Sequence, residues 1–544
     1  MRAWRSTAST AFMLTTAAIA GCGGGGSGSV GSGGGSGGGG NPPPPPVQQP
    51  LTGVFVAGGV QGLHFRTATR EGVTDAEGRF TFLPGETVAF SIGGVQLGSA
   101  AGAAQIDPFD LVGMTPPGTE LALRAELTTV GDVTGFDRVA NIALLLVSLD
   151  VDKDPETGID LTGWDAALAG ASLSLDVPLT LFAFERFESF KHAHGVNRSV
   201  PIELPLVLLY RALGITVVAQ ARGSVTVTER SGAVVTAFQY DEHGRLIRTG
   251  VSNGETRSAY DRDGRLVSAE AERFDQDGSL TSRRVTALEY DAAGKRTLAS
   301  IEFRSVGTNL RTETRYTYDA AGVLLSQQFD FDRELDESID TRDTTTHTYD
   351  AAGNEVGRLT EHDANFDDTP DSRTLTTLAY DASGNLVTET IESDDSEESF
   401  AFSRSYDSSG RLATFAAETL VSGSPRLRET MTFTYDAAGR VTSELIELDA
   451  NLDDDVLDER TSTVRTYDAI GNCLSAQTER VRADDDIHEF SASLHTYGPT
   501  GALLATRNET QGVLMREDVF TLVEISAGVG YLIREHLGGQ LAGD

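Results

Sequence analysis

Cysteine is almost absent from this chain, whose 544 residues include only Cys22 and Cys473. So few thiols exclude a disulfide framework and a cysteine-based zinc site. Positive charge is also scarce, because 43 Lys and Arg stand against 80 Asp and Glu, for a formal net charge of −37. A charge of this sign and size argues against nucleic acid and against anionic membrane surfaces as partners.

The usual sequence signatures of catalysis are missing as well. The chain holds no nucleophile elbow, P-loop or dinucleotide-binding fingerprint. Carboxylates are abundant, but the sequence marks no two of them as the catalytic acid and base or nucleophile of a glycosidase. The sequence therefore predicts a non-catalytic protein.

The N-terminus predicts export. A basic start over residues 1–5 precedes an apolar, Ala- and Thr-rich run that ends at Ala20. This pattern is typical of a secretory signal, and the run is too short and too weakly apolar to span a bilayer as a stable helix. We therefore assign residues 1–21 to a signal peptide.

The segment Ile19-Ala20-Gly21-Cys22 resembles the lipobox of bacterial lipoproteins. The resemblance implies that Cys22 becomes the lipidated first residue of the mature chain, and Gly23 after it favours the outer membrane. Residues 23–40 are almost pure Gly and Ser, and residues 42–46 are all Pro. A flexible coil followed by a stiff spacer predicts a tether over residues 22–50, through which the lipid holds the protein at a membrane.

Residues 51–112 predict short strands with tight turns. The segment from Thr74 to Phe82 has Asp and Gly at a turn and then alternating phenylalanines, which is a hairpin pattern. It resembles the hairpin of carboxypeptidase-regulatory-like or transthyretin-like β-sandwich modules, which implies a structural or binding unit. Over residues 113–222 the pattern becomes helical, and the apolar run at residues 141–149 predicts a buried helix.

A short phrase, Tyr-Asp-x-x-Gly, recurs through the second half of the chain. From Tyr318 to Tyr349 to Tyr380 the step is 31 residues each time (349−318 and 380−349). A fixed period of this size indicates an array of one supersecondary unit, here a strand, a tight turn and a second strand. The phrase begins at Tyr240, Tyr260, Tyr290, Tyr318, Tyr349, Tyr380, Tyr406, Tyr435 and Tyr467, with a degenerate copy at Tyr497.

This phrase resembles the YD repeat of the Rhs family, which includes Rhs toxins, teneurins and the shells of Tc toxins. The resemblance covers about half of the chain and implies a β-shell that can enclose a cargo. The array is short for a full shell, and the chain lacks the family's Asp-Pro-x-Gly core end and a toxin-like extension. We expect an extended sheet of hairpins over residues 223–510 and a cap over residues 511–544, and leave open whether the sheet closes on itself.

The loops between the strands are dense in carboxylates. Oxygen ligands at alternate positions of a short loop are typical of calcium sites. The same loops also fit a simpler role, in which charge keeps the edges and faces of a sheet soluble, and both interpretations stay open. The candidate calcium ligands are Asp363, Asn365, Asp367 and Asp371, then Asp449, Asn451, Asp453 and Asp458, and finally Asp150, Asp152 and Asp154.

Together these features predict a mainly β protein, with a small β-sandwich and helical appendage followed by an extended YD-repeat β-hairpin array. The expected role is that of a lipid-anchored binding or adhesion scaffold of the outer membrane or cell surface, which contacts glycans or proteins. The alternative is a carrier or remnant of an Rhs-type toxin system that holds a separately encoded effector.

Overall fold

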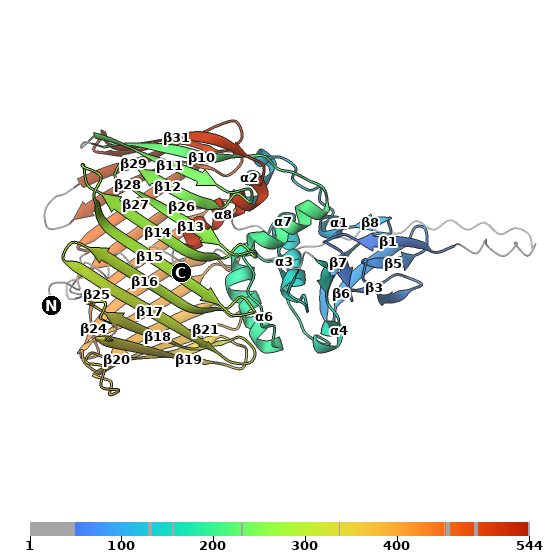
Figure 1. Ribbon diagram of the computed structural model, residues 1–544, viewed down its shortest axis with the longest axis horizontal. Coiled ribbons are helices and arrows are strands. Elements are labelled where there is room, and N and C mark those ends of the chain that lie inside the picture. Colours follow the sequence, from blue (N-terminus) through green and yellow to red (C-terminus); the bar gives the residue numbers. More distant parts are fainter. Residues whose placement is uncertain are drawn as a thin grey trace, which may run out of the picture.

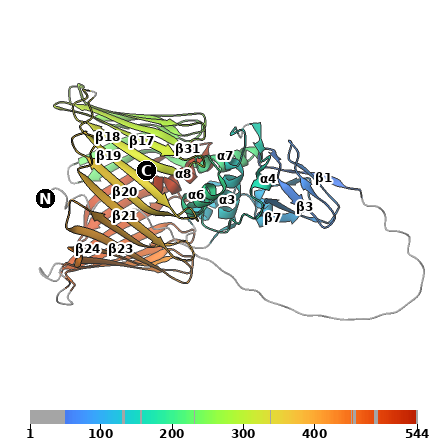
Figure 2. The same cartoon turned by 90° about the horizontal axis from the view of Figure 1, so that it is seen from below.

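The protein has a wide barrel at one end and a smaller region of sheets and helices at the other (Figure 1). The computed structural model describes residues 49–128, 133–154, 157–229, 232–336, 338–450, 452, 457–482 and 488–541. The predicted signal peptide, Cys22 and most of the predicted tether lie outside these ranges. The helices lie between the N-terminal sheets and the barrel (Figure 2).

Short strands near the N-terminus form two main sheets, in the orders β5-β1-β8 and β4-β3-β6-β7, and a third pair joins β2 to β9. Phenylalanines join the two main sheets, since the ring centroid of Phe90 lies 4.8 Å from that of Phe55 and 5.2 Å from that of Phe80. The strands are β1 (Leu51–Phe55), β2 (Val60–Gln61), β3 (His64–Arg66), β4 (Glu71–Val73), β5 (Arg79–Phe82), β6 (Thr87–Ile92), β7 (Val95–Ala101), β8 (Gln105–Ile106) and β9 (Ile159–Asp160).

The hairpin predicted around Asp75 does not form. The turn itself is present, because the Gly78 N–H donates to the Asp75 carbonyl at 2.9 Å and Gly78 has a φ of 75°. However, β4 and β5 on its two sides belong to different sheets. The buried side chains of these strands share one hydrophobic core with the helices. The separate small β-sandwich that the sequence predicted is therefore wrong.

Helices fill most of the segment between the N-terminal sheets and the barrel. The helix α3 is buried along most of its length, and its buried Asn141 donates to the carbonyls of Leu175 (3.0 Å) and Val177 (2.8 Å). The apolar run predicted to be a buried helix lies in α3. The helical elements are α1 (Pro108–Val112), α2 (Glu120–Thr128), α3 (Gly135–Ser148), α4 (Trp164–Ala167), α5 (Leu179–Leu181), the π-helical turn η3 (Phe182–Arg186), α6 (Phe187–His194), α7 (Glu203–Ala212) and the C-terminal α8 (Gly528–Leu541).

The second half of the chain forms a closed barrel. In the described part of the chain, 22 strands from β10 to β31 pair with their neighbours in sequence order, and the last strand also pairs with the first. The barrel strands are β10 (Ala219–Glu229), β11 (Gly232–Tyr240), β12 (Leu246–Val251), β13 (Gly254–Tyr260), β14 (Leu266–Phe274), β15 (Leu280–Tyr290), β16 (Arg296–Ser305), β17 (Thr308–Tyr318), β18 (Leu324–Asp332), β19 (Thr341–Tyr349), β20 (Glu355–Asp363), β21 (Ser372–Tyr380), β22 (Leu386–Ser393), β23 (Glu398–Tyr406), β24 (Leu412–Val421), β25 (Ser424–Tyr435), β26 (Val441–Asp449), β27 (Glu459–Tyr467), β28 (Cys473–Arg482), β29 (His488–Tyr497), β30 (Leu503–Thr510) and β31 (Val513–Ile525).

The predicted fold class is thus corrected from an extended hairpin array to a closed barrel, within a protein that is still mainly β. The register shifts between Thr434 and Tyr435, and a shift of this kind recurs beside most of the other repeat tyrosines. Such bulges bend a strand and add to the right-handed twist of the sheet. Closure then removes both edges, whose unpaired backbone groups would otherwise face water.

Except in the degenerate copy at Tyr497, where Gly498 replaces it, each repeated turn is held by its aspartate. In the copy that begins at Tyr435, the Asp436 carboxylate accepts from the backbone N–H of Arg440 at 2.9 Å and from its Nε at 2.7 Å. The Gly439 N–H donates to the Asp436 carbonyl at 3.0 Å, and Gly439 has a φ of 76°, in the left-handed region that favours glycine. These contacts explain why Asp and Gly recur at fixed positions.

The repeat tyrosines link each turn to the preceding one. The Tyr435 hydroxyl donates to the Leu412 carbonyl at 2.7 Å, and the Arg411 guanidinium lies 4.6 Å from the centroid of the Tyr435 ring. The same hydroxyl-to-carbonyl bond joins Tyr260 to Leu246, Tyr290 to Leu266, Tyr318 to Arg296, Tyr349 to Leu324, Tyr380 to Glu355, Tyr406 to Leu386, Tyr467 to Val441 and Tyr497 to Cys473.

Replacing the turn glycine should weaken the barrel. Gly439→Val places a β-branched side chain at a positive φ, which costs about 1–3 kcal/mol. Thermal denaturation should show a lower midpoint for this variant. Gly250→Val is the matched control, because Gly250 lies in a strand and an added Cβ there meets no atom within 4 Å. Equal midpoints for the two variants would contradict the strain at Gly439.

Removing one tyrosine hydroxyl should have a smaller effect. Tyr435→Phe deletes the hydrogen bond to the Leu412 carbonyl, and such a bond contributes about 0.5–1.5 kcal/mol to the free energy of unfolding. Chemical denaturation of the full chain measures the loss. Tyr316→Phe serves as the control, since Tyr316 is a barrel tyrosine outside the series. The same loss in both variants would mean that the bond between turns adds nothing.

Candidate functional site

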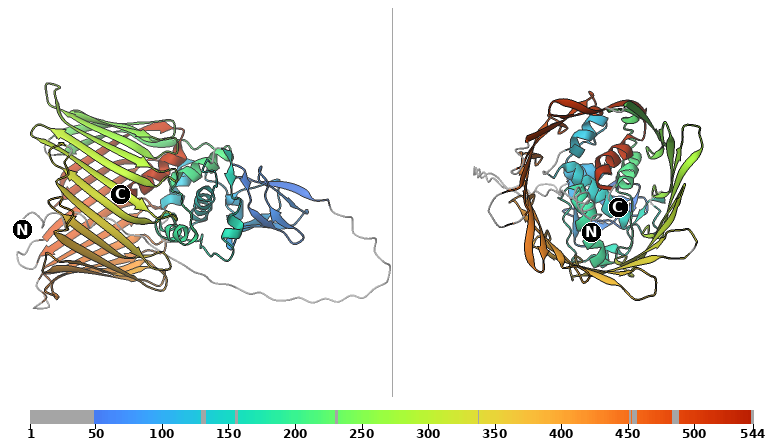
Figure 3. Two further views of the ribbon diagram at one scale, coloured as in Figure 1. Left: turned by 60° about the horizontal axis from the view of Figure 1, so that its bottom comes forward. Right: turned by 90° about the vertical axis from the view of Figure 1, so that its left-hand side faces the viewer.

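The barrel has two faces, and the repeat tyrosines mark the inner one. The Tyr240 ring lies 5.5 Å from Tyr531 of α8, and the Tyr349 ring lies 5.7 Å from His192 of α6. The helices lie within the outline of the barrel when it is viewed along its axis (Figure 3). Because side chains alternate along a strand and paired residues share a face, these contacts assign an inner and an outer face to every strand.

Charged side chains cover the outer face, where they pair across and along the strands. Arg283 contacts Glu270 at 2.5 Å and Arg373 contacts Glu361 at 2.9 Å. Further outer pairs are Arg248 with Glu255, Arg304 with Glu302, Arg311 with Glu313, Arg428 with Glu418, Arg460 with Glu447, and Arg507 with Glu509. The outer face of the barrel is therefore polar at the level of the strands as well as at the loops.

The inner face lines a wide interior. A barrel of about eight strands is filled by its own side chains, whereas larger barrels enclose water or a plug. Along β16 and β26 no residue is buried on either face. The main hydrophobic core comes instead from the N-terminal region, α8 and the first residues of β10. Solvent therefore reaches both faces of these barrel strands.

The helical region closes one end of the barrel by contacting the repeated turns. The Ser199 N–H donates to the Ala293 carbonyl at 2.8 Å, and the Arg534 guanidinium of α8 donates to the His243 carbonyl at 2.8 Å. At the turn of Gly322, an added Cβ would lie 2.4 Å from Asn197 Oδ1. We call the region from α1 to α7, together with α8, the cap; it differs from the cap predicted over residues 511–544, because Val513–Ile525 form the barrel strand β31. The long acidic loops join the strands at the opposite end.

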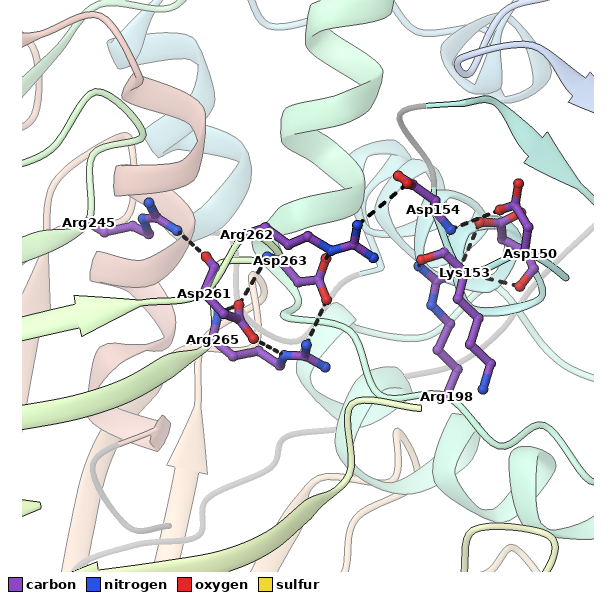
Figure 4. A network of polar contacts seen from close by, with 10 residues as sticks. Asp150, Lys153, Asp154, Arg198, Arg245, Asp261, Arg262, Asp263 and Arg265 are labelled. Carbon is purple, nitrogen blue, oxygen red and sulfur yellow. Dashed lines mark hydrogen bonds and ion pairs between the residues drawn. The ribbon is translucent and has the colours of Figure 1, made fainter. Parts of the chain in front are cut away.

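A charged network joins the cap to the barrel (Figure 4). The Asp150 side chain is fully buried and accepts from the Arg198 guanidinium at 3.1 Å. Burial raises the pKa of Asp150, although the hydrogen bond from Arg198 opposes this shift. Farther along, Asp154 contacts Arg262 of the barrel at 3.6 Å. A surface cavity of about 380 Å³ lies beside Asp150, Lys153 and Arg198.

The three predicted calcium ligands in this network, Asp150, Asp152 and Asp154, make hydrogen bonds or ion pairs within the protein, and calcium binding by them stays a prediction. Asp150 accepts from the Asp160 N–H at 3.0 Å and from Arg198, and Asp152 accepts from the Asp154 N–H and the Thr157 hydroxyl, both at 2.9 Å. Hydrogen bonds of this kind lower the pKa of Asp152. These carboxylates hold a loop and its contact with the barrel.

The acidic loops use their carboxylates in a similar way. Asp363 accepts from the backbone N–H groups of Asp367 (3.2 Å) and Asp368 (2.9 Å), and Asp371 accepts from that of Ala364 (2.8 Å). The side chain of Asn365 also accepts from the Asp367 N–H.

In the second loop, Asp449 accepts from the Leu452 N–H and Asp458 from the Ala450 N–H, while Asn451 and Asp453 lie outside the described residues. Among the residues that the structure describes, no group of three or more His, Cys, Asp or Glu is placed to hold a metal ion. Calcium binding by these loops stays a prediction.

Sequence reasoning did not single out an apolar patch on the inner face. Strand pairing places Ile391 opposite Phe400, and Met431 opposite both Phe415 and Ile446, while the rings of Phe402 and Phe415 stack at 6.1 Å. The alternation Phe400-Ala401-Phe402 was a usable signal, but it does not say which face points inward. We call Ile391, Phe400, Phe402, Phe415, Met431 and Ile446 the inner apolar patch.

Comparison with known proteins gives no family. No family model matches the chain, and no curated protein matches it. Among solved structures, a TcdB2-TccC3-Cdc42 complex is 16% identical over 52% of this chain and 15% of its own, with a TM-score of 0.28. The Photorhabdus luminescens Tc holotoxin pore is 14% identical over 53% of this chain and 18% of its own, with a TM-score of 0.25. The chain spans less than a fifth of these toxin chains.

A porin-like protein from Bacteroides uniformis is 11% identical over 42% of this chain and 96% of its own, with a TM-score of 0.21. Likeness at this level decides neither ancestry nor function. The prediction of an Rhs-family YD-repeat lipoprotein is wrong, because the part of the chain that the structure describes forms a closed barrel of 22 strands. A shared turn phrase specifies the turn and leaves the global fold undetermined.

The size and closure of the barrel fit an outer-membrane or surface location. Within the described residues, no helix is both long and apolar enough to cross a membrane.

The pH dependence of stability should reveal one strong charge cluster at the rim. Burial would raise the pKa of Glu355, but hydrogen bonds from His347 (2.5 Å) and Arg358 (2.8 Å) outweigh it and lower the pKa to about 2. A carboxyl with a depressed folded pKa stabilises the protein above its unfolded pKa, and this contribution is lost as the pH falls through the folded value. Glu355→Gln should therefore be destabilising at pH 7, with a difference from wild type that shrinks between about pH 4.5 and pH 2.

Chemical denaturation across this pH range measures the effect. Glu361→Gln is the control, because the pair of Glu361 with Arg373 is partly exposed at the surface and surface pairs contribute about 0–1 kcal/mol. A constant difference between Glu355→Gln and wild type down to pH 2 would contradict the depressed pKa.

Proposed function

We propose that the protein is a non-catalytic, lipid-anchored scaffold of the cell envelope, whose barrel stands in water beside the outer membrane and binds ligands there. The observation that carries this proposal is the charged outer face of the barrel. Glu270, Glu302 and Glu418 lie within strands of that face, away from the strand ends.

A barrel that crosses a membrane needs an apolar outer band about 25 Å tall, and a basic residue at its midplane costs about 2–4 kcal/mol. The outer face here carries repeated Arg–Glu pairs in place of such a band. The outer face of the barrel therefore suits contact with water and not with lipid. Attachment to the membrane then depends on the N-terminal segment. The predicted lipid on Cys22 and the Gly- and Pro-rich tether would supply it.

The cap supports a binding role with a defined direction. One end of the barrel is closed by helices, so ligands reach the interior through the end that carries the acidic loops. The net charge of −37 repels anionic lipid headgroups and keeps the barrel off the bilayer. Glycans or proteins outside the bilayer are then the partners that the open end and the inner face can meet.

Removing the anchor should release the protein. Cys22→Ala abolishes the lipid attachment, and the polar barrel should then remain in solution without detergent after the membranes are sedimented. Wild type should stay with the outer-membrane fraction and leave it only in detergent. Cys473→Ala is the control, since Cys473 lies in β28 of the barrel. A Cys22→Ala protein that resists extraction from the membrane by alkaline carbonate would overturn the proposal, because the barrel would then hold itself in the bilayer.

A further inference from the structure

We propose that the inner apolar patch binds cationic amphiphiles, which are ligands with an apolar body and one positive charge. The inference rests on the proposed function as a binding scaffold, and it names a ligand class and a place for that role. Three properties carry it: five of the six patch side chains are only partly buried, an unpaired carboxylate lies beside the patch, and acidic loops stand at the end through which a ligand enters.

The inner apolar patch remains accessible to solvent. Phe415 is 8% exposed, and the other five residues are only partly buried, although all six lie within strands that have hydrogen-bonded neighbours on both sides. Their side chains lie outside the main hydrophobic core. The Arg404 guanidinium lies 5.2 Å from the centroid of the Phe415 ring, and the partly exposed apolar side chains around it form the kind of contiguous patch that marks a binding surface.

One carboxylate in this part of the inner face lacks a counter-charge. Strand pairing places Glu429 between Ala417 and Leu448, two residues along its strand from Met431 of the patch. Within the described residues, no ion pair or side-chain hydrogen bond joins Glu429 to another group. Burial and the nearby charge of Glu459 raise the pKa of Glu429. A cation bound beside Glu429 would remove this cost.

The neighbouring carboxylates of the inner face already have partners. Glu389 contacts Arg404 at 3.1 Å, and Glu444 contacts Arg465 at 2.7 Å. Glu459 contacts Arg480 at 2.6 Å. The excess negative charge at the patch is therefore localised on Glu429, which lies beside the apolar side chains as a single charge.

The entrance adds selectivity for charge. The loop between β22 and β23 carries Asp394, Asp395 and Glu397 at the open end of two strands that supply the patch. Negative charge at an entrance attracts cations and repels anions. Inside, the aromatic rings of Phe400 and Phe402 offer faces that attract a cation as well as apolar surface. An anionic amphiphile would meet the same apolar surface with repulsion at the entrance and at Glu429.

Calorimetric titration tests the proposal with the Cys22→Ala chain, otherwise of full length. Decyltrimethylammonium is the probe and decyl sulfate is the matched anion, both kept below the concentrations at which they form micelles. We expect saturable binding of the cation and at least tenfold weaker binding of the anion. Equal affinities would overturn the preference for cations, and the absence of saturable binding by either would overturn the site.

Two variants locate the site, each with an outward-facing control. Glu429→Gln should weaken binding of the cation about tenfold, which corresponds to about 1.4 kcal/mol, while Glu418→Gln on the outer face of the adjacent strand should not. Phe402→Thr should weaken binding of both probes, whereas Leu445→Thr on the outer face of β26 should not. Equal losses in a variant and its control would overturn the assignment to the inner face, because they would indicate general attraction to an acidic protein.

The binding titrations and the membrane-release experiment can fail independently of each other. If Cys22→Ala stays in membranes, the location of the barrel is wrong, and the same titrations are then run on protein in nanodiscs with empty nanodiscs as the reference. The comparison of Glu429→Gln with Glu418→Gln decides the ligand site in either setting. Thermal melting of each variant, with a midpoint close to that of the parent chain, shows that a loss of binding is not a loss of folding.

Discussion

Backbone pairing between the first and last barrel strands is the interaction on which the rest of the structure depends. It joins β10 to β31, from Ala219 opposite Ile525 to Glu229 opposite Arg516. Without it the sheet would end in two edges of unpaired N–H and C=O groups. The same pairing places α8, which follows β31, against α2 and α7, where Leu532 and Ile533 complete the hydrophobic core. Closing the barrel and completing the core are thus one structural event.

Local features of the chain were predictable because their causes are local. Asp436 and Gly439 specify their turn through contacts within five residues, and the apolar run in α3 carries its own helical pattern. The closure of the barrel was not predictable, since β10 and β31 are about 300 residues apart in sequence and the sequence of neither strand specifies which strand it pairs with. The N-terminal hairpin failed for the same reason: the partners of β4 and β5 are set by packing and not by the turn between them.

The candidate site was harder to predict than the fold. Thr432-Phe433-Thr434 shows an alternation, but both faces of the barrel meet water, so composition alone does not say which is inside. The spacing of Asp363, Asn365 and Asp367 suits calcium and equally suits the capping of backbone N–H groups in a tight loop, which is the use found here. Arg–Glu pairs balance charge along the strands, so the acidic excess gathers in the loops at the open end.

The fit of the cap to the turns constrains how such a protein can change in size. Ser199 and Arg534 contact two particular turns of the barrel. The cap therefore closes one end of the barrel and also fits a barrel of one particular circumference. A tandem sequence changes most simply by duplication or deletion of one hairpin. Such a change would alter the circumference of the barrel, and the cap would then no longer fit the turns that it contacts. The number of repeats and the cap should therefore change together. Proteins of this architecture should differ in repeat number only where the cap differs as well.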